Sequence, residues 1–219
     1  MSIGRMSDQA SVQRQRQWKG VPAAERRRQR RSLLIEAAIA VYGQHGYRGA
    51  TVKSVCEAAG LSERYFYESF ANGEAMLAAS AEAVMAFLIG ELRQAALADV
   101  PPPLRVRAML RSYFDTLRRH PASARVFLVE IRGVSASVDE VFARELDRVA
   151  GLIVETWEAE AGVDSLLAIG VVGAVMQVAL AWIGGGYARP LEEVTDAAFH
   201  LSAVLNPTVL TGERSTRIA

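Results

Sequence analysis

The chain has 219 residues, one cysteine and a formal net charge of +1 at pH 7, and these bounds exclude several classes of protein. The lone Cys56 excludes an intrachain disulfide and fits a reducing compartment, so the cytoplasm is the expected location. The net charge hides an asymmetry, because residues 1–70 carry 12 Lys and Arg against 6 Asp and Glu, whereas residues 71–219 carry 13 against 18. The basic first third indicates a polyanionic partner.

Composition and hydrophobic periodicity predict an all-α fold. Ala, Leu, Val, Glu and Arg are abundant, period-2 alternation is scarce, and the seven prolines fall mostly where helices would begin or end. Residues 1–21 contain few apolar side chains and no apolar segment of the kind found in secretory signals, so they are expected to form a flexible basic arm. After Pro22, a first helix is expected over residues 23–46, which Gly43 and Gly46 help to end.

Two short helices follow. Thr51 is the expected N-cap of a helix over residues 52–59, which Gly60 ends, and Ser62 is the expected N-cap of a helix that continues through Phe70. The short lengths and the tight glycine turn between them are typical of a helix-turn-helix.

The second short helix contains three consecutive aromatic residues, which cannot all face one core because successive side chains turn by about 100°. With Phe66 and Phe70 directed inward, Arg64 points outward between Tyr65 and Tyr67. An arginine flanked by two hydroxyl-bearing rings fits a DNA groove, where hydroxyls bond phosphates and the guanidinium can bond guanine. Sideways packing of both tyrosines on neighbouring helices is the alternative.

Six further helices are expected, for about nine in all. They are placed at 74–98, 104–119, 122–132 and 135–161, from Asp164 onward, and at 190–206. No charge occurs between Asp164 and Arg189, and this uncharged stretch is long enough to span a bilayer. Gln177 inside it, the glycines at its end and the missing flanking basic residues favour a buried helix instead.

Residues 24–77 resemble the DNA-binding domain of TetR-type bacterial transcriptional regulators, without a gap. The residues that carry the resemblance are Leu34 to Ala40, Gly46, Ala50, Thr51, Val55 to Leu61, Tyr67, Phe70, Glu74 and Leu77. The resemblance implies that Thr51 and Tyr67 contact DNA phosphates. It also implies that Arg64 and Tyr65 face bases, and that Lys53 contacts the DNA backbone or the edge of the groove.

Two positions depart from the family pattern. Ser69 stands where a histidine is usual, and Gly73 stands where a lysine commonly contacts a phosphate. Arg48, or the basic residues Arg27 and Arg28, are candidate substitutes for that contact. The complete set of candidate DNA-binding residues is Arg48, Thr51, Lys53, Ser62, Arg64, Tyr65 and Tyr67.

The remainder of the chain resembles the family in architecture, which implies a helical effector-binding and dimerisation domain. The expected division is a basic arm at 1–21, a helix-turn-helix domain at 22–72, the larger helical domain at 73–207 and a tail at 208–219. A helix that is apolar on all sides can be buried between its own domain and a symmetry mate, so the uncharged helix and the last helix are expected to form a four-helix dimer interface. The candidate interface residues are Gly170, Gly173, Ala174, Leu201, Val204 and Leu205.

An effector cavity is expected where large apolar side chains of the long helices meet occasional polar ones. The candidates are Met85, Leu88, Tyr113, Phe114, Leu117, Phe127, Glu130, Trp157, Met176, Gln177 and Trp182. A largely apolar effector, oriented by Tyr113, Glu130 or Gln177, is the corresponding hypothesis. Ordinary core packing is the alternative for each residue.

These features predict a homodimeric one-component regulator that binds a palindromic double-stranded DNA operator and is released by a small-molecule effector, most simply as a repressor. A ligand-independent DNA-binding or nucleoid-type protein and an activator remain alternatives. No enzyme is expected, because no nucleophile has its base at a suitable spacing. No cofactor, metal or membrane partner is expected either, since His45, His120 and His200 lack metal-ligand spacing.

Overall fold

The computed structural model describes residues 22–158 and 164–206, and in these ranges it is helical without strands. Nine α-helices, one π-helical segment and one 3₁₀ turn are present in the described residues, which confirms the all-α prediction. They are α2 (Ala23–His45), α3 (Val52–Ala59), α4 (Glu63–Tyr67), α5 (Gly73–Ala96), α6 (Pro102–Arg119), α7 (Pro121–Arg125), η1 (Val126–Glu130), α8 (Ala136–Thr156), α9 (Ser165–Gly184), α10 (Leu191–Ser202) and η2 (Ala203–Leu205). The expected arm at 1–21 and tail at 208–219 lie outside the described residues.

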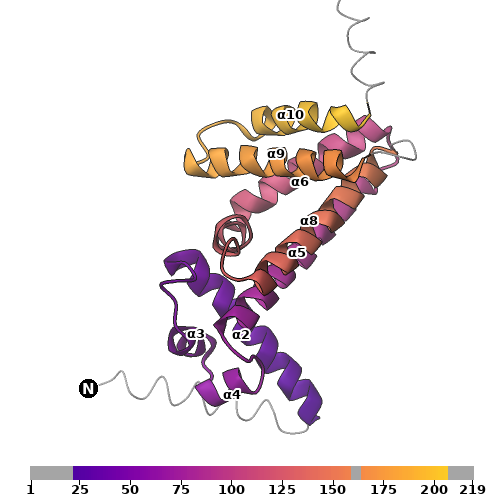
Figure 1. Cartoon of the computed structure of the whole chain (residues 1–219). Helices are drawn as coiled ribbons and strands as arrows, with labels where there is room; N and C mark the ends of the chain where they lie inside the picture. Colours follow the sequence, from indigo (N-terminus) through magenta and orange to yellow (C-terminus); the bar gives the residue numbers. More distant parts are fainter. Residues whose placement is uncertain (1–21, 159–163, 207–219) are drawn as a thin grey trace, which may run out of the picture.

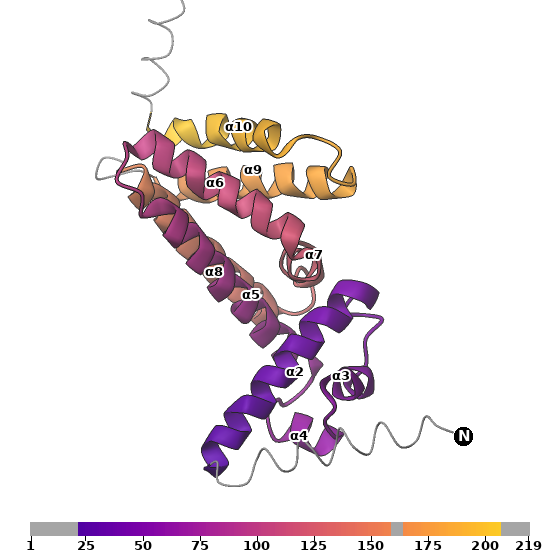
Figure 2. The same ribbon diagram turned by 180° about the vertical axis from the view of Figure 1, so that it is seen from behind.

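The molecule has a small head and a larger body. Helices α2, α3 and α4 form the head, α5 and α8 lie side by side and lead away from it, and α9 and α10 lie across the far end (Figures 1 and 2). One hydrophobic cluster centres on head residues such as Leu34, Val55 and Phe66, and it extends to η1 and the start of α8. A second cluster joins α5, α6, α8, α9 and α10. The head therefore packs directly on the body at α2, α7 and η1.

Helix α4 ends at Tyr67 and is shorter than the expected helix through Phe70. Ser62 occupies the N-cap position but its side chain makes no capping hydrogen bond. Beyond the end of α4, the backbone amide of Phe70 donates to the carbonyl of Phe66 (2.8 Å), so the chain continues as a turn. It then becomes extended at Asn72, whose Oδ1 accepts from the amide of Ala75 (2.8 Å) and caps α5.

The body also departs from the expected boundaries. The single helix expected at 122–132 is α7 followed by η1, in which the backbone widens from α-helical to π-helical winding. Helix α8 ends at Thr156, before the expected 161, and residues 159–163 lie outside the described ranges. Two described helices, α5 and α9, are long and apolar enough to cross a membrane, although more than half of the apolar window of α5 is buried in the protein.

The contact between α2 and α7 leaves no room for a side chain at Gly43. A Cβ atom built on Gly43 would lie 2.4 Å from Cβ of Ala122 and 2.6 Å from its Cα. Such a distance is far inside van der Waals contact, so glycine sets how closely the head approaches the body.

We therefore expect Gly43→Ala to lower the free energy of unfolding by about 1–3 kcal/mol, because α7 must move to admit the methyl group. The matched control is Gly151→Ala, since a Cβ on this exposed α8 residue meets nothing within 4 Å. That control should be neutral or stabilising by up to about 1 kcal/mol through helix propensity. Urea denaturation measures both, and equal stability of the two variants would contradict the close approach.

Candidate DNA-binding surface and effector cavity

Thr51 is held rigidly at the start of α3 by a capping box. The Ser54 amide donates to Thr51 Oγ1 (3.0 Å), and the Thr51 amide donates to Ser54 Oγ (3.0 Å). The Thr51 oxygen acts as an acceptor here, which leaves its hydroxyl hydrogen able to bond an external oxygen. The helix N-terminus beside it favours an anion, so Thr51 is well placed for a phosphate.

The turn between α3 and α4 depends on Gly60. This residue has a φ of 64° in the left-handed region, where glycine avoids the steric penalty of a Cβ. The turn lets Phe66 reach the head core, where it is 0% exposed and packs against Phe70 with ring centroids 5.7 Å apart. The predicted inward orientation of Phe66 is confirmed.

The two tyrosines beside Phe66 have different environments. Tyr67 is 61% exposed, and its ring and that of Phe66 meet edge to face. Tyr65 is half-buried, and the guanidinium of Arg30 from α2 lies 4.3 Å from its ring centroid. Tyr65 thus packs sideways on α2, as the alternative interpretation proposed, whereas Tyr67 projects outward.

Arg64 is exposed and pairs with Glu68 one turn later, at 3.1 Å between Nε and Oε1. Glu68 also lies near Arg30 at 3.6 Å, and its backbone carbonyl accepts from Arg27 (2.6 Å). An exposed ion pair contributes only about 0–1 kcal/mol, so Arg64 can leave Glu68 for another acceptor at little cost.

The remaining candidate DNA contacts lie on exposed surface. Arg48 and Ser62 are exposed, and Lys53 is exposed beside Glu57 at 4.0 Å. At Gly73, the position without the usual lysine, a Cβ would meet the Tyr47 hydroxyl at 3.4 Å. All seven candidates therefore belong to the head, and all except Tyr65 are exposed.

The Cys56 side chain lies inside the head rather than on this surface. It is 3% exposed, and burial raises the pKa of its thiol, with the Glu63 carboxylate adding to the rise. A thiol that resists ionisation is a poor nucleophile. Across residues 22–158 and 164–206, no group of three or more His, Cys, Asp or Glu could hold a metal ion.

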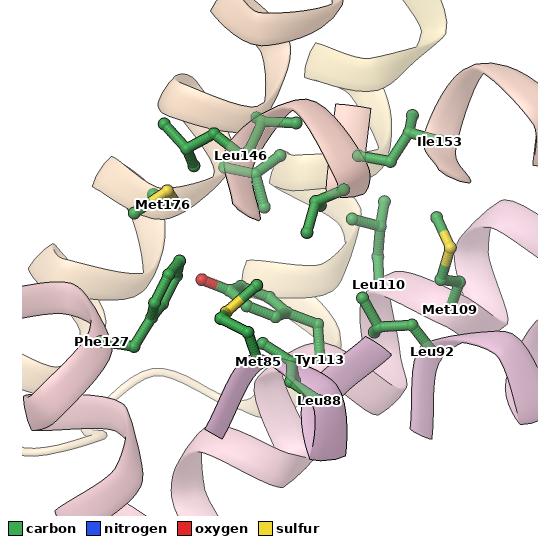
Figure 3. A pocket seen from close by; sticks show the side chains of 13 residues that line it. Met85, Leu88, Leu92, Met109, Leu110, Tyr113, Phe127, Leu146, Ile153 and Met176 are labelled. Carbon is green, nitrogen blue, oxygen red and sulfur yellow. The ribbon is translucent and has the colours of Figure 1, made fainter. Parts of the chain in front are cut away.

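A narrow apolar cavity of about 30 Å³ lies in the body between α5, α6, η1, α8 and α9 (Figure 3). Five predicted residues line it, namely Met85, Leu88, Tyr113, Phe127 and Met176. Sequence reasoning missed the other eight, which are Leu92, Met109, Leu110, Leu146, Val149, Ile153, Val172 and Val175. These eight are ordinary core residues by pattern, so only the packing reveals that they enclose a space.

Tyr113 carries the only oxygen among the side chains that line this cavity. Its hydroxyl is buried and has no hydrogen-bond partner among the described residues, and it points toward Phe127 and Met176 (Figure 3). Burial raises the pKa of Tyr113 well above its ordinary value, so the hydroxyl stays protonated and can donate a hydrogen bond. An unsatisfied buried hydroxyl costs about 1–3 kcal/mol, which a ligand acceptor would recover.

Four aromatic or aliphatic candidates are buried but do not line the cavity. Phe114 and Trp182 pack edge to face at 5.8 Å, and Trp182 Nε1 donates to the carbonyl of Arg189 (2.8 Å). Trp157 stacks on Phe199 with centroids 5.6 Å apart. For these residues and Leu117, the alternative of ordinary core packing describes the observed environment.

Two polar candidates also lie elsewhere. Gln177 is exposed on the outer face of α9, so its predicted place in the cavity is not supported. Glu130 lies at the head–body junction, where Oε2 accepts from the amide of Tyr47 (2.8 Å) and Oε1 pairs with Arg125 Nε (2.8 Å). Because Glu130 and Phe127 belong to the same π-helical segment, η1 joins the cavity wall to the head. Such segments are common at functional sites.

The outer face of α9 and α10 carries most of the predicted interface residues. Gly170, Gly173, Leu201 and Val204 are exposed and Ala174 is half-buried. Leu205 differs, because it is 3% exposed and packs in the body core of its own chain.

A helix-turn-helix head on a helical body is an arrangement found in DNA-binding regulators. Residues 34–80 match the family model for bacterial regulatory proteins of the tetR family. The head of the chain therefore carries a DNA-binding domain of the tetR family of bacterial regulatory proteins.

Two relatives of the chain are transcriptional regulators. The transcriptional repressor KstR2 of Mycobacterium tuberculosis is 23% identical over 107 residues, and the match covers 49% of this chain and 54% of that protein. This chain thus spans about half the length of that repressor. The transcriptional activator FasR of Mycolicibacterium smegmatis is 26% identical over 199 residues, covering 86% of this chain and 90% of that protein.

Solved structures share the fold over most of the chain. The fatty acid degradation regulator FadR of Bacillus halodurans has a TM-score of 0.69 at 19% identity, covering 81% of this chain and 95% of that one. FadR of Bacillus subtilis, in complex with stearoyl-CoA, has a TM-score of 0.65 at 18% identity, covering 78% and 96%. At these identities the likeness establishes the fold alone.

The unpartnered hydroxyl in the cavity predicts the effect of Tyr113→Phe on stability. The variant should be as stable as the wild type or up to about 1 kcal/mol more stable, because no hydrogen bond is lost. The contrasting control is Ser80→Ala, since the buried Ser80 hydroxyl donates to the carbonyl of Met76 (2.8 Å). That variant should lose about 0.5–1.5 kcal/mol. A clear loss of stability in Tyr113→Phe, measured by urea denaturation, would show that the hydroxyl has a partner.

Proposed function

We propose that the protein is a cytoplasmic, homodimeric repressor that binds a palindromic operator and is released by a largely apolar small-molecule effector. The observation that carries this proposal is the apolar cavity with one unpartnered hydroxyl, joined through η1 to the DNA-binding head. Activation is a second candidate, because the relative FasR is an activator.

In the proposed complex, α4 enters the major groove and α3 approaches the backbone. Arg64 would contact a base edge, while Thr51 and Tyr67 would bond phosphates on either side. Their exposure, together with the fixed geometry of Thr51, supports these roles. Tyr65 would contribute through its exposed portion while Arg30 holds its ring in place.

The proposed dimer would use the outer faces of α9 and α10, where Gly170, Gly173, Leu201 and Val204 are exposed. Two chains related by a twofold axis would present two α4 helices about one turn of DNA apart, which matches a palindromic site. Burial of this face between two chains would also shield the apolar surface of α9 from water without a membrane.

The proposed effector contains a long aliphatic chain and an acceptor for the Tyr113 hydroxyl. The B. subtilis FadR complex with stearoyl-CoA provides an example of such a ligand in a protein of this fold. Ligand pockets usually have volumes of about 300–1,000 Å³, so the narrow cavity must widen when it is filled. Met85, Met109 and Met176 make this possible, since methionine side chains adapt their shape readily.

The effector would reach the head through η1. Filling the cavity displaces Phe127, and Glu130 follows because it lies in the same π-helical segment. The carboxylate then pulls on the Tyr47 amide at the end of α2, which reorients the head. By thermodynamic reciprocity, operator DNA must weaken effector binding by the same factor.

The DNA contacts are tested on a site selected from a random pool of duplexes. Tyr67→Phe should weaken binding to all sequences similarly, whereas Arg64→Ala should reduce discrimination at one base pair by about 1–3 kcal/mol. Arg93→Ala, on exposed body surface, is the control and should change neither property. Fluorescence anisotropy on a panel of single-base variants measures these effects. Unchanged specificity in Arg64→Ala would refute its base-reading role.

The effector and its route are tested with stearoyl-CoA, with acetyl-CoA as the short-chain control. Stearoyl-CoA should reduce operator affinity by about 5–150-fold, whereas acetyl-CoA should not. Glu130→Gln should bind stearoyl-CoA in calorimetry as the wild type does, but release DNA less. Glu82→Gln, which removes an exposed partner of Arg144, is the matched control.

The outcomes separate the claims. An operator complex that resists stearoyl-CoA refutes the ligand class. Full release in Glu130→Gln leaves the ligand class intact and refutes the route through η1.

A further inference from the structure

Helix α9 has an exposed stripe that runs along its whole length. Its members are Leu166, Gly170, Gly173, Gln177, Ala181 and Gly184. Leu166, at the N-terminal end, is 74% exposed and is the largest apolar side chain of the stripe. Burial of this side chain against a partner could contribute about 1.5–3 kcal/mol.

The opposite end of the same helix has a cleft of about 400 Å³ between α9 and α10. Its lining is mainly apolar, with Val178, Ala181, Trp182 and Val194, and Arg189 and Glu193 supply charges at its edge. Trp182 Nε1 donates to the carbonyl of Arg189, so the residues after α9 fold back and place Arg189 beside Trp182. One helix therefore carries an exposed leucine at one end and an apolar cleft at the other.

Symmetry relates these two ends. In a dimer whose two heads meet one DNA duplex, the twofold axis must run roughly along the direction from body to head. Helix α9 lies across that direction (Figures 1 and 2). Rotation about the axis therefore reverses α9, and the two copies pair in antiparallel orientation.

We propose that the partner subunit's Leu166 fills the cleft beside Ala181 and Trp182, and that the reciprocal contact forms at the other end. In this register Gly170 faces Gln177 and Gly173 faces Ala174, so each larger side chain meets a small one. The small residues at the centre allow the backbones to approach closely. A shallow crossing of about 20°, usual in four-helix bundles, keeps the ends of the two helices in contact.

Charge complementarity supports the same register. Asp164 precedes Leu166 and caps α9, its Oδ1 accepting from the Leu166 amide (2.8 Å). In the antiparallel pair, Asp164 lies level with Ile183 of the other copy, one residue beyond Trp182, whose Nε1 donates to the Arg189 carbonyl. Glu193, in the first turn of α10, lines the same cleft as Arg189. An antiparallel pair thus brings the acidic end of one α9 to the end of the other α9 that precedes Arg189.

This inference rests on the proposed dimer, and disulfide trapping tests its register. In a Cys56→Ala background, the double variant Leu166→Cys with Ala181→Cys should form a cross-linked dimer when an oxidant is added. Leu166→Cys alone should not, because its two copies would lie about 22 Å apart along the helices, beyond the reach of a disulfide. Replacing Leu166→Cys by Leu97→Cys, at a leucine of similar exposure (73%), should abolish trapping.

Dimer affinity gives a second measurement that needs no covalent bond. Leu166→Asp should raise the dimer dissociation constant at least about tenfold, because a carboxylate would be buried in an apolar cleft. Leu97→Asp should leave it unchanged. Sedimentation velocity measures both.

Each outcome has a separate meaning. A monomeric wild type overturns the proposed dimer itself. A wild-type dimer that fails to cross-link through the double variant, or that tolerates Leu166→Asp, overturns the register while the dimer stands.

Discussion

The carboxylate of Glu130 is the interaction on which the relation between head and body depends. It accepts the Tyr47 amide just after α2 and pairs with Arg125 from α7, so one side chain joins three segments. Gly46 beside it has a φ of 74°, and a Cβ there would lie 3.2 Å from Glu130 Oε2. Together with the close approach at Gly43, this arrangement fixes where the head sits. The position of the head is therefore set in part by contacts from the body.

Much of the fold follows from periodicity, caps and turn residues, because these are local properties. Gly60 ends α3 through its left-handed backbone conformation, Thr51 caps α3 through its side chain, and Phe66 is directed inward by the helix wheel. The widening of the backbone into η1 could not be predicted, since residues 122–132 have the pattern of an ordinary helix. The hydrophobic pattern of the segment does not reveal that Glu130 must contact the chain just after α2.

The candidate site shows the same limit. Periodicity identifies which residues share a face, but it does not identify what that face meets. Tyr113 and Phe127 face the cavity, whereas Trp157 and Trp182 have equally suitable side chains and pack elsewhere. Gln177 and Glu130 are polar residues in apolar surroundings by sequence, yet one faces outward and the other faces the head. Only the tertiary arrangement distinguishes these environments.

The shortness of α4 has a consequence for how binding preference can change. A helix of five residues is too short to be stable alone, so its conformation comes from the anchors Phe66 and Phe70 and from the turn at Gly60. Arg64 is exposed and contributes little to those anchors. If Arg64 has the base-reading role that we propose, its replacement would alter the recognised sequence without unfolding the head, which would make α4 a natural point for redirecting the protein to new operators.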